Sequence, residues 1–316
     1  MAGLVPAIHA LFGSAADKQG VDARHKAGYD RLRRPTVPLD PRLNAFRPDL
    51  AASSLRGRVE AAQFVDGTVH RIADSHAPLR REPRHDAELS TEALYGERFV
   101  AYDIDAEGWV WGQLTGDGYV GYLAANALGR VGPAPTHKVS TTLTLGFPGT
   151  DIKLPPIVTL PMGAQIVVTR QDDRFAQTDG GLFIASRHVA PIDGRAPDFV
   201  AVAERFFGTP YLWGGKTPLG IDCSGLVQIA LQAAGIACPR DSDMQAQALG
   251  KPSSFDKLRR GDLIFWKGHV AIARDPQTIV HANAHHMAVA IEPVVEAIAR
   301  IKAAGADVTG VRRVAA

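Results

Sequence analysis

The sequence predicts an α+β protein in which short β strands come first and a helix with an antiparallel sheet comes last. Between Thr68 and Pro191, apolar and polar residues alternate in short runs that Gly and Asp turns interrupt, which is typical of small β barrels. After Pro191, the strongly apolar stretch Leu226–Ala234 has helical length and precedes several strand-like runs. The 316 residues suggest two or three domains, at roughly 150 residues per domain.

The N-terminal part, residues 1–66, is rich in charge and proline, and we expect an extended arm. Within it, a short helix is predicted over Leu50–Ala62, capped by Asp49 or Ser53. The apolar stretch Ala2–Ala16 suggests a signal peptide but has no Lys/Arg n-region, which favours a cytoplasmic protein over an exported one. No apolar run reaches the roughly 18 residues that a membrane helix needs, so we expect no membrane span.

Residues 67–130 and 131–192 contain the strand-like runs. The runs of the first stretch alternate between apolar and polar residues: Arg98–Ile104, Trp109–Leu114 and Gly118–Leu123. In the second stretch, Gln165–Thr169 and Gly181–Ala185 are predicted strands on either side of an Asp-Asp turn. The two stretches have similar length and order of elements, which indicates a degenerate internal repeat and hence two small barrels.

Residues 193–316 are the predicted α+β domain. An amphipathic helix is expected over Pro197–Phe207, and Gly235 is a suitable residue to end the helix Leu226–Ala234. Strands are predicted over Gly261–Ala273, Ile279–Ala282 and Ala288–Ile291. Helices followed by an antiparallel sheet complete the α+β prediction.

Composition narrows the possible functions. A net charge of +2 is too small to argue for nucleic-acid binding. The only cysteines, Cys223 and Cys238, do not make a disulfide framework, so no oxidising compartment is implied. Cys238 stands beside Pro239 in no recognisable chemical pattern, and we expect it to be structural.

Cys223 has a different setting, because it lies in Gly220-Ile-Asp-Cys-Ser-Gly225, directly ahead of the apolar helix. The partial positive charge and unpaired amides of a helix N-terminus favour a thiolate, and a nearby imidazolium favours it more. His269 and His281 fall on two predicted neighbouring strands. A histidine there can take the thiol proton and later protonate a leaving amine, while the second orients the first.

The chain resembles two known families. Gly96-Glu97, Trp109 and Asp117-Gly-Tyr-Val-Gly-Tyr122 resemble the bacterial SH3 family. The C-terminal domain resembles the NlpC-type cysteine peptidases in six segments, which are Thr209-Pro-Tyr-Leu-Trp-Gly-Gly215, Asp222-Cys-Ser-Gly225, Arg240-Asp-Ser242, Arg260-Gly-Asp-Leu263, Gly268-His-Val270 and Val280-His-Ala282. This resemblance implies a papain-like fold that hydrolyses peptidoglycan peptides without a cofactor.

The resemblance also implies residue roles. Cys223 would be the nucleophile, His269 the base and His281 the third polar residue. Tyr211 would lie beside the nucleophile, where its hydroxyl and the backbone amide of Cys223 could stabilise an oxyanion.

An SH3-type domain ahead of such a peptidase resembles the dipeptidyl-peptidase-like subgroup, which cuts the γ-D-glutamyl–diamino acid bond of peptides with a free N-terminal L-Ala. The residues around the nucleophile would then bind substrate: Asp222, Ser224, Asp241 and Ser242. A free ammonium needs a carboxylate and a hydroxyl, for which we expect Asp241 and, from the first barrel, Tyr119 ahead of Tyr122, with Glu82 as a weaker candidate.

Three alternatives stay open. His281, His285 and His286, with His269, form a possible metal cluster, although no His-Glu-x-x-His pattern occurs. A non-catalytic wall-binding protein is a second reading, since SH3 domains often serve as targeting modules. Amidase or acyl-transfer chemistry at the same Cys-His pair is the third.

Overall fold

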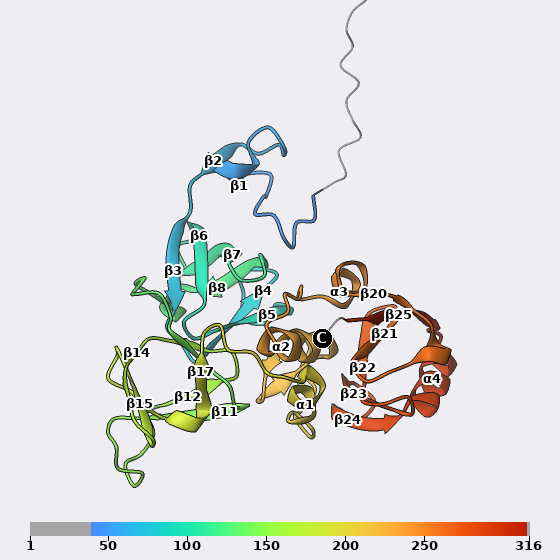
Figure 1. The fold of residues 1–316 in the computed structure, drawn as a ribbon. Coiled ribbons are helices and arrows are strands. Elements are labelled where there is room, and N and C mark those ends of the chain that lie inside the picture. The colour runs from blue at the N-terminus through green and yellow to red at the C-terminus, as the bar shows by residue number, and fades with distance from the viewer. Residues whose placement is uncertain (1–38, 315–316) are drawn as a thin grey trace, which may run out of the picture. The chain divides into compact units, whose positions relative to one another are not determined.

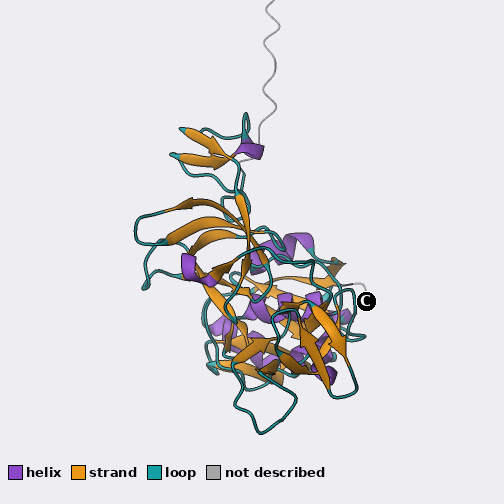
Figure 2. Ribbon diagram, turned by 90° about the vertical axis from the view of Figure 1, so that its left-hand side faces the viewer, coloured by secondary structure: helices purple, strands orange, loops and turns teal. Residues whose placement is uncertain are grey.

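The computed structural model of the chain describes residues 39–314, coloured in Figure 1. The stretch Ala2–Ala16 and the rest of the predicted arm up to residue 38 lie outside these residues. From residue 39 onward the chain clusters as one compact unit. Among the described residues, no helix is long and apolar enough to cross a membrane. Figure 2 shows that strands dominate the fold, and the labelled α-helices of Figure 1 lie in its yellow-to-red, C-terminal part.

The helix predicted over Leu50–Ala62 is wrong. Leu50–Ala52 is strand β1, which pairs in parallel with β2 (Gln63–Val65), and only Ser53–Leu55 forms a 3₁₀ turn. Gly57 then takes a φ of +76°, a conformation that ends helical structure. The pairing buries the small apolar residues of β1, so tertiary contacts outweigh the local helix propensity.

Residues 68–129, which we call the first barrel after the sequence-based expectation, form a seven-stranded sheet in the order β5-β4-β8-β7-β6-β3-β9. Its strands are β3 (Thr68–Ile72), β4 (His76–Arg80), β5 (Leu89–Leu94), β6 (Arg98–Ile104), β7 (Trp109–Leu114), β8 (Val120–Ala124) and β9 (Leu128–Gly129). The three alternating runs of the sequence are confirmed as β6, β7 and β8. Their inward side chains, such as Phe99, Leu114 and Leu123, form a closed apolar core.

Residues 137–191 form a three-stranded sheet, β13-β10-β17, and a five-stranded sheet, β12-β11-β16-β15-β14. The strands are β10 (His137–Val139), β11 (Leu143–Phe147), β12 (Val158–Pro161), β13 (Gln165–Ile166), β14 (Val168–Gln171), β15 (Phe175–Thr178), β16 (Phe183–Ala185) and β17 (Val189–Pro191). The predicted Asp-Asp turn joins β14 to β15, where the carboxylate of Asp172 accepts from the amides of Arg174 and Phe175.

The C-terminal part is built on a six-stranded sheet in the order β20-β25-β21-β22-β23-β24. Its strands are β20 (Lys251–Ser253), β21 (Asp262–Trp266), β22 (His269–Ala273), β23 (Thr278–Asn283), β24 (Ala288–Pro293) and β25 (Val308–Arg313). A short hairpin, β18 (Lys216–Thr217) and β19 (Gly220–Ile221), precedes it. The helices are α1 (Phe199–Glu204), α2 (Cys223–Ala233), α3 (Ser242–Ala248) and α4 (Val294–Ala303).

Successive side chains of a strand point to opposite faces of this sheet, and helices pack on both faces. Leu263 and Phe265 of β21 pack with α1 and α2, whereas Ile264 and Trp266 pack with α4. Both predicted helices occur, although α1 is shorter than Pro197–Phe207, and Gly235 follows the end of α2 with a φ of +75°. The mixed helix and sheet composition is therefore confirmed.

Candidate active site

Cys223 is the first residue of α2, and Asp222 caps that helix. The carboxylate of Asp222 accepts from the amide of Gly225 at 2.6 Å, from the amide of Gly214 at 2.8 Å and from both terminal nitrogens of Arg240 at 2.9 and 2.8 Å. Gly225 is required here, because an added Cβ would lie 2.3 Å from the carbonyl oxygen of Gly215. Asp222, predicted to bind substrate, thus holds the turn that carries Cys223.

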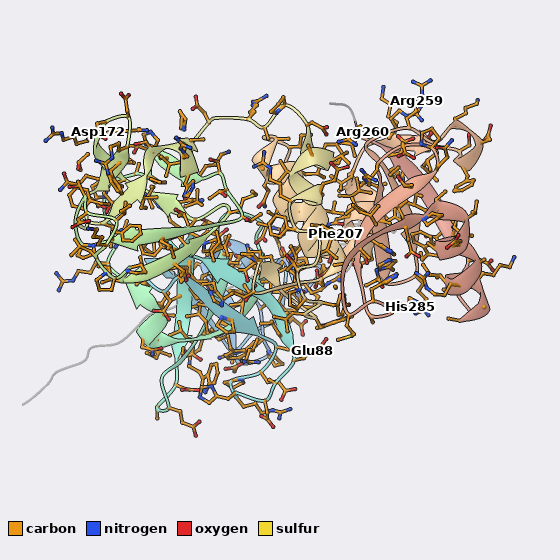
Figure 3. All side chains as sticks on the ribbon, turned by 90° about the horizontal axis from the view of Figure 1, so that it is seen from below. Glu88, Asp172, Phe207, Arg259, Arg260 and His285 are labelled. Atoms are coloured by element: carbon orange, nitrogen blue, oxygen red, sulfur yellow. The ribbon has the colours of Figure 1, made fainter. Side chains whose placement is uncertain are left out.

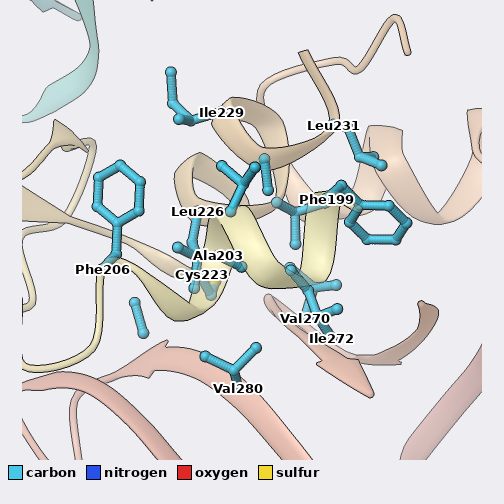
Figure 4. Close-up of a cluster of buried hydrophobic side chains, with 14 of the residues drawn as sticks. Phe199, Ala203, Phe206, Cys223, Leu226, Ile229, Leu231, Val270, Ile272 and Val280 are labelled. Atoms are coloured by element: carbon cyan, nitrogen blue, oxygen red, sulfur yellow. The ribbon is translucent and has the colours of Figure 1, made fainter. Parts of the chain in front are cut away.

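The thiol of Cys223 is buried in the apolar cluster between α1, α2 and the sheet (Figure 4). Burial raises the pKa of the Cys223 thiol to about 12, and the charge of Asp222 adds to the effect. The backbone amide of Val270 donates to the sulfur and opposes this rise. Because Val270 directly follows His269, this contact brings the start of β22 to Cys223.

The two predicted histidines meet. Nε2 of His269 lies 2.8 Å from Nδ1 of His281, and the rings are tilted by 58°. Burial lowers the pKa of His269 to about 3, and the pKa of His281 is also lowered by burial. Burial therefore favours the neutral thiol over the thiolate and the neutral imidazoles over the imidazolium forms.

Sequence reasoning missed two residues behind these rings. Oε1 of Glu292 lies 2.7 Å from Nε2 of His281, and Arg300 of α4 donates to both oxygens of Glu292 at 2.6 Å. Burial alone would raise the pKa of Glu292, but the hydrogen bonds from Arg300 and His281 hold it well below its usual range. A signal was available, because Glu292 directly follows a predicted strand next to the one that carries His281.

A cleft of about 740 Å³ opens at Cys223. It is lined by the segment ahead of the first barrel, by the first barrel itself and by the C-terminal part. The predicted residues that line it are Cys223, Tyr211, Asp222, Ser224, Asp241, Ser242, Tyr119 and Tyr122. Residues more than 100 positions apart in the sequence therefore share one cavity.

Asp241 and Tyr119 contact each other in this cleft, since the tyrosine hydroxyl donates to Oδ2 of Asp241 at 3.0 Å. Burial, then the charge of Asp241, raises the pKa of Tyr119, so its hydroxyl stays protonated. Arg42 was not anticipated: it donates to the same Oδ2 at 2.8 Å and also binds Asp40 and Asp243. Three carboxylates thus surround one guanidinium.

The remaining predicted residues have different surroundings. Tyr211 lies beside the nucleophile, and burial raises the pKa of its hydroxyl to about 12. Ser224 is buried and bonds to Asp222 and Arg240, whereas Ser242 begins α3 at the edge of the cleft. Tyr122 accepts from Arg47 at 3.1 Å.

Glu82 does not line the cleft; it is exposed, and its carboxylate accepts from Arg84 at 3.0 Å. The glutamate that does line it is Glu88, labelled in Figure 3, whose Oε1 accepts from the indole of Trp213 at 3.0 Å. The pairing of β4 with β5 has a register shift next to Arg80. Counting residues along the sequence therefore does not reveal which glutamate reaches the cleft.

The histidine cluster considered for a metal is divided in the structure. His281 bonds to His269 and Glu292, while His286 bonds to Asn283. His285, labelled in Figure 3, is exposed. Its ring packs edge-on against that of His286. Over residues 39–314, no three His, Cys, Asp or Glu side chains are grouped as metal ligands.

Comparison with known families matches two segments of the chain. Residues 79–128 match the bacterial dipeptidyl-peptidase Sh3 domain, and residues 208–306 match the NlpC/P60 family. The second segment contains Cys223, His269, His281, Glu292 and Arg300.

Curated relatives match over parts of their length. Dipeptidyl-peptidase 6 of Lysinibacillus sphaericus is 42% identical over 84 residues, which are 27% of this chain and 31% of that protein. Gamma-D-glutamyl-L-lysine dipeptidyl-peptidase of Bacillus subtilis is 28% identical over 201 residues, which are 57% of this chain and 65% of that protein. The chain thus spans less than two thirds of the length of either relative.

One solved structure supports the fold. An NlpC/P60 family protein from Bacillus cereus superimposes with a TM-score of 0.67 at 21% identity, over 78% of this chain and 99% of that one. At this identity the likeness concerns the fold alone.

Proposed function

Because this chain carries an NlpC/P60 domain behind a bacterial dipeptidyl-peptidase SH3 domain, we propose that it is a cysteine peptidase of short peptidoglycan peptides. The bond cut is the γ-D-glutamyl–diamino acid bond of peptides with a free N-terminal L-Ala. The observation that carries this proposal is the setting of Cys223. This residue begins α2 and lines the cleft, and its sulfur accepts from the amide of Val270, the residue after His269.

The proposed mechanism starts from a neutral Cys223 thiol and a neutral His269 imidazole. His269 takes the thiol proton as the Cys223 sulfur attacks the γ-carbonyl carbon of D-Glu. The amide of Cys223 and the hydroxyl of Tyr211 stabilise the oxyanion. As the tetrahedral species collapses, the C–N bond breaks, His269 protonates the leaving amine, and a thioester remains.

Water completes the cycle. His269 removes a proton from the water that attacks the thioester, and it returns that proton to the sulfur when the C–S bond breaks. The products are a dipeptide with a new γ-carboxylate and a peptide that begins with the diamino acid. No cofactor takes part in these steps.

The SH3 barrel supplies substrate selection in this proposal. Asp40, Asp241 and Asp243 carry three negative charges against the single positive charge of Arg42, so this group, of which Asp241 and Asp243 line the cleft, would attract an ammonium locally. Oδ2 of Asp241 already accepts from Arg42 and Tyr119, and the N-terminal ammonium of the peptide would take its Oδ1.

Three further assignments belong to the same proposal. The C-terminal domain from residue 193 is papain-like, and residues 131–192 are a second, divergent SH3-like domain behind the first at 67–130. The location is cytoplasmic, where trimming of free peptides serves the recycling of wall fragments. Because the barrel narrows the cleft, intact crosslinked wall is not the substrate.

The main test compares the two cysteines. Cys223→Ala should abolish turnover of L-Ala-γ-D-Glu-diamino acid tripeptides while calorimetry still detects peptide binding, and Cys238→Ala should leave turnover intact. Full activity of folded Cys223→Ala would remove the cysteine mechanism. Loss of activity with EDTA but none with a thiol alkylator would favour the metal reading instead.

A second test concerns the substrate's amine. Acetylation of the N-terminal amine should abolish cleavage, and efficient cleavage of the blocked peptide would remove the role of Asp241 and Tyr119. Mass spectrometry of the products separates hydrolysis from acyl transfer, because a transferase would attach an added amine to the γ-carbonyl. A folded protein that binds wall peptides without any product would be a targeting module.

A further inference from the structure

Four side chains form one continuous series of contacts that ends at the catalytic base of the proposed function. His269 contacts His281, His281 contacts Glu292, and Glu292 contacts Arg300. The separations along this series are 2.8, 2.7 and 2.6 Å. His281 and Glu292 are 1% and 8% exposed, so water does not replace these partners.

The strand register explains why Glu292 reaches His281. His281 lies opposite Ala290 in the β23–β24 pair, and Glu292 lies opposite Ile279. Glu292 is therefore a diagonal neighbour of His281 on the same face of the sheet, a relation that brings long side chains into contact. Arg300 comes from α4, which packs on that face.

The donors and acceptors of this series can be assigned from one end. An arginine only donates and an ionised carboxylate only accepts. Arg300 occupies both oxygens of Glu292, which keeps the carboxylate ionised and leaves the contact with His281 to be donated by the ring. Nε2 of His281 therefore carries a proton. A neutral imidazole has one N–H, so Nδ1 of His281 accepts, and the 2.8 Å contact must be donated by Nε2–H of His269.

We propose that Glu292 and Arg300 are positioning residues that fix both imidazoles in the Nε2–H tautomer, which leaves Nδ1 of His269 as the free base for the Cys223 thiol. This inference rests on the Cys223–His269 pair of the proposed function. When His269 takes the thiol proton, the imidazolium is bonded through His281 to a fixed negative charge. A ligand or base held by such a second carboxylate is more basic and better oriented.

The tautomer is measurable without any substrate. In the ¹⁵N-labelled full-length protein at neutral pH, imidazole ¹⁵N–¹H correlations distinguish Nε2–H from Nδ1–H, and His269→Gln and His281→Gln identify the two rings. We expect Nε2–H on both. A proton on Nδ1 of either ring in the unmodified protein overturns the proposal.

A matched pair of variants tests the cause. Glu292→Gln and Glu296→Gln each remove one negative charge near Arg300, but Glu296 is exposed in the first turn of α4 and only Glu292 contacts His281. In Glu292→Gln, Arg300 should bind the amide oxygen and turn the NH₂ group toward His281. His281 must then accept at Nε2, so both ring protons should move to Nδ1.

Thiol reactivity reports the consequence. With Nδ1 of His269 protonated, iodoacetamide should alkylate Cys223 about 10- to 100-fold more slowly in Glu292→Gln, and at the unchanged rate in Glu296→Gln. Peptide mass spectrometry separates Cys223 from Cys238. Equal rates in the two folded variants would overturn the proposal. If Glu292→Gln does not fold, the tautomer in the unmodified protein decides. Neither assay uses a peptide, so an incorrect substrate assignment would leave both results unaffected.

Discussion

Arg240 and Asp241 are neighbours in the chain, yet each forms a carboxylate–arginine pair in a different environment. Arg240 points inward to Asp222, and the two side chains are 0% and 10% exposed. Asp241 points into the cleft toward Arg42, and that pair is 23% and 35% exposed. The inner pair also binds Gly214, Gly215 and Gly225 through backbone groups, whereas the outer pair binds Tyr119 and other carboxylates.

The difference in burial gives the two pairs different effects on the stability of the fold. A buried charge whose partner is removed stays desolvated, so the inner pair must remain intact for the nucleophile's turn to form. A partly exposed pair contributes little to stability and can exchange one cation for another. The same chemistry therefore holds the backbone at Arg240 and, one residue later, leaves the carboxylate of Asp241 partly exposed in the cleft, where the proposed function places the ammonium.

The largest expected effect comes from breaking the inner pair. Arg240→Met leaves the buried carboxylate of Asp222 without its cation and should lower the free energy of unfolding by about 3–5 kcal/mol. Urea denaturation measures this loss. Arg42→Met is the control and should cost less than about 1 kcal/mol. Equal losses in the two variants would show that burial does not distinguish the pairs.

A smaller effect, on binding alone, is expected from the outer carboxylate. Asp241→Asn removes the charge that would bind the peptide's ammonium, and kcat/KM for the free-amine tripeptide should fall about 10- to 100-fold, with most of the change in KM. The unfolding midpoint should hardly move. The side chain of Asp243 is more exposed than that of Asp241, so kcat/KM should fall by much less in Asp243→Asn. A loss of stability without a change in KM would assign Asp241 to structure instead.

Removal of the outer arginine should act in the opposite direction. Without Arg42, the three carboxylates lose their internal cation and attract the ammonium more strongly, so KM should decrease about two- to fivefold. Steady-state kinetics at low and high salt measure the change, which salt should reduce. Arg84→Ala, an exposed arginine paired with Glu82, is the control. An increase in KM would mean that Arg42 itself binds a substrate carboxylate.

The smallest effect distinguishes two glutamates of the first barrel. Glu88→Gln should raise KM about twofold, since Glu88 lines the cleft and bonds to Trp213. Glu82→Gln should leave kinetics unchanged, because its carboxylate pairs with Arg84 outside the cleft. If Glu82→Gln has the larger effect, the predicted role of Glu82 stands and the cleft lining does not identify the contact.

The sequence indicated those features of the site that local patterns encode. Cys223 opens a helix, His269 and His281 lie on adjacent strands, and Tyr119 contacts Asp241, as the motifs suggested. Arg42 could not be inferred, since its contact with Asp241 spans 199 positions and no motif marks it.

The differences between the sequence-based expectations and the structure come from contacts that the local sequence does not contain. The expected helix over Leu50–Ala62 failed because β1 pairs with β2, a contact that local propensity does not contain. Asp222 was expected to bind substrate because it adjoins Cys223; it lines the cleft, and its carboxylate also accepts from Arg240, Ser224 and two glycine amides. Adjacency in sequence thus indicated proximity to the site but not the direction in which a side chain points.

Two main-chain carbonyls of the short segment ahead of the first barrel accept hydrogen bonds from that barrel. The carbonyl of Arg42 accepts from the amide of Val120, and the carbonyl of Leu43 accepts from the side chain of Gln113. A shortened chain that starts at residue 67 would keep both matched domains and the nucleophile, but its cleft would lack one wall. Under the proposed function, a protein trimmed in this way would accept a wider range of peptides than the chain that includes residues 39–66.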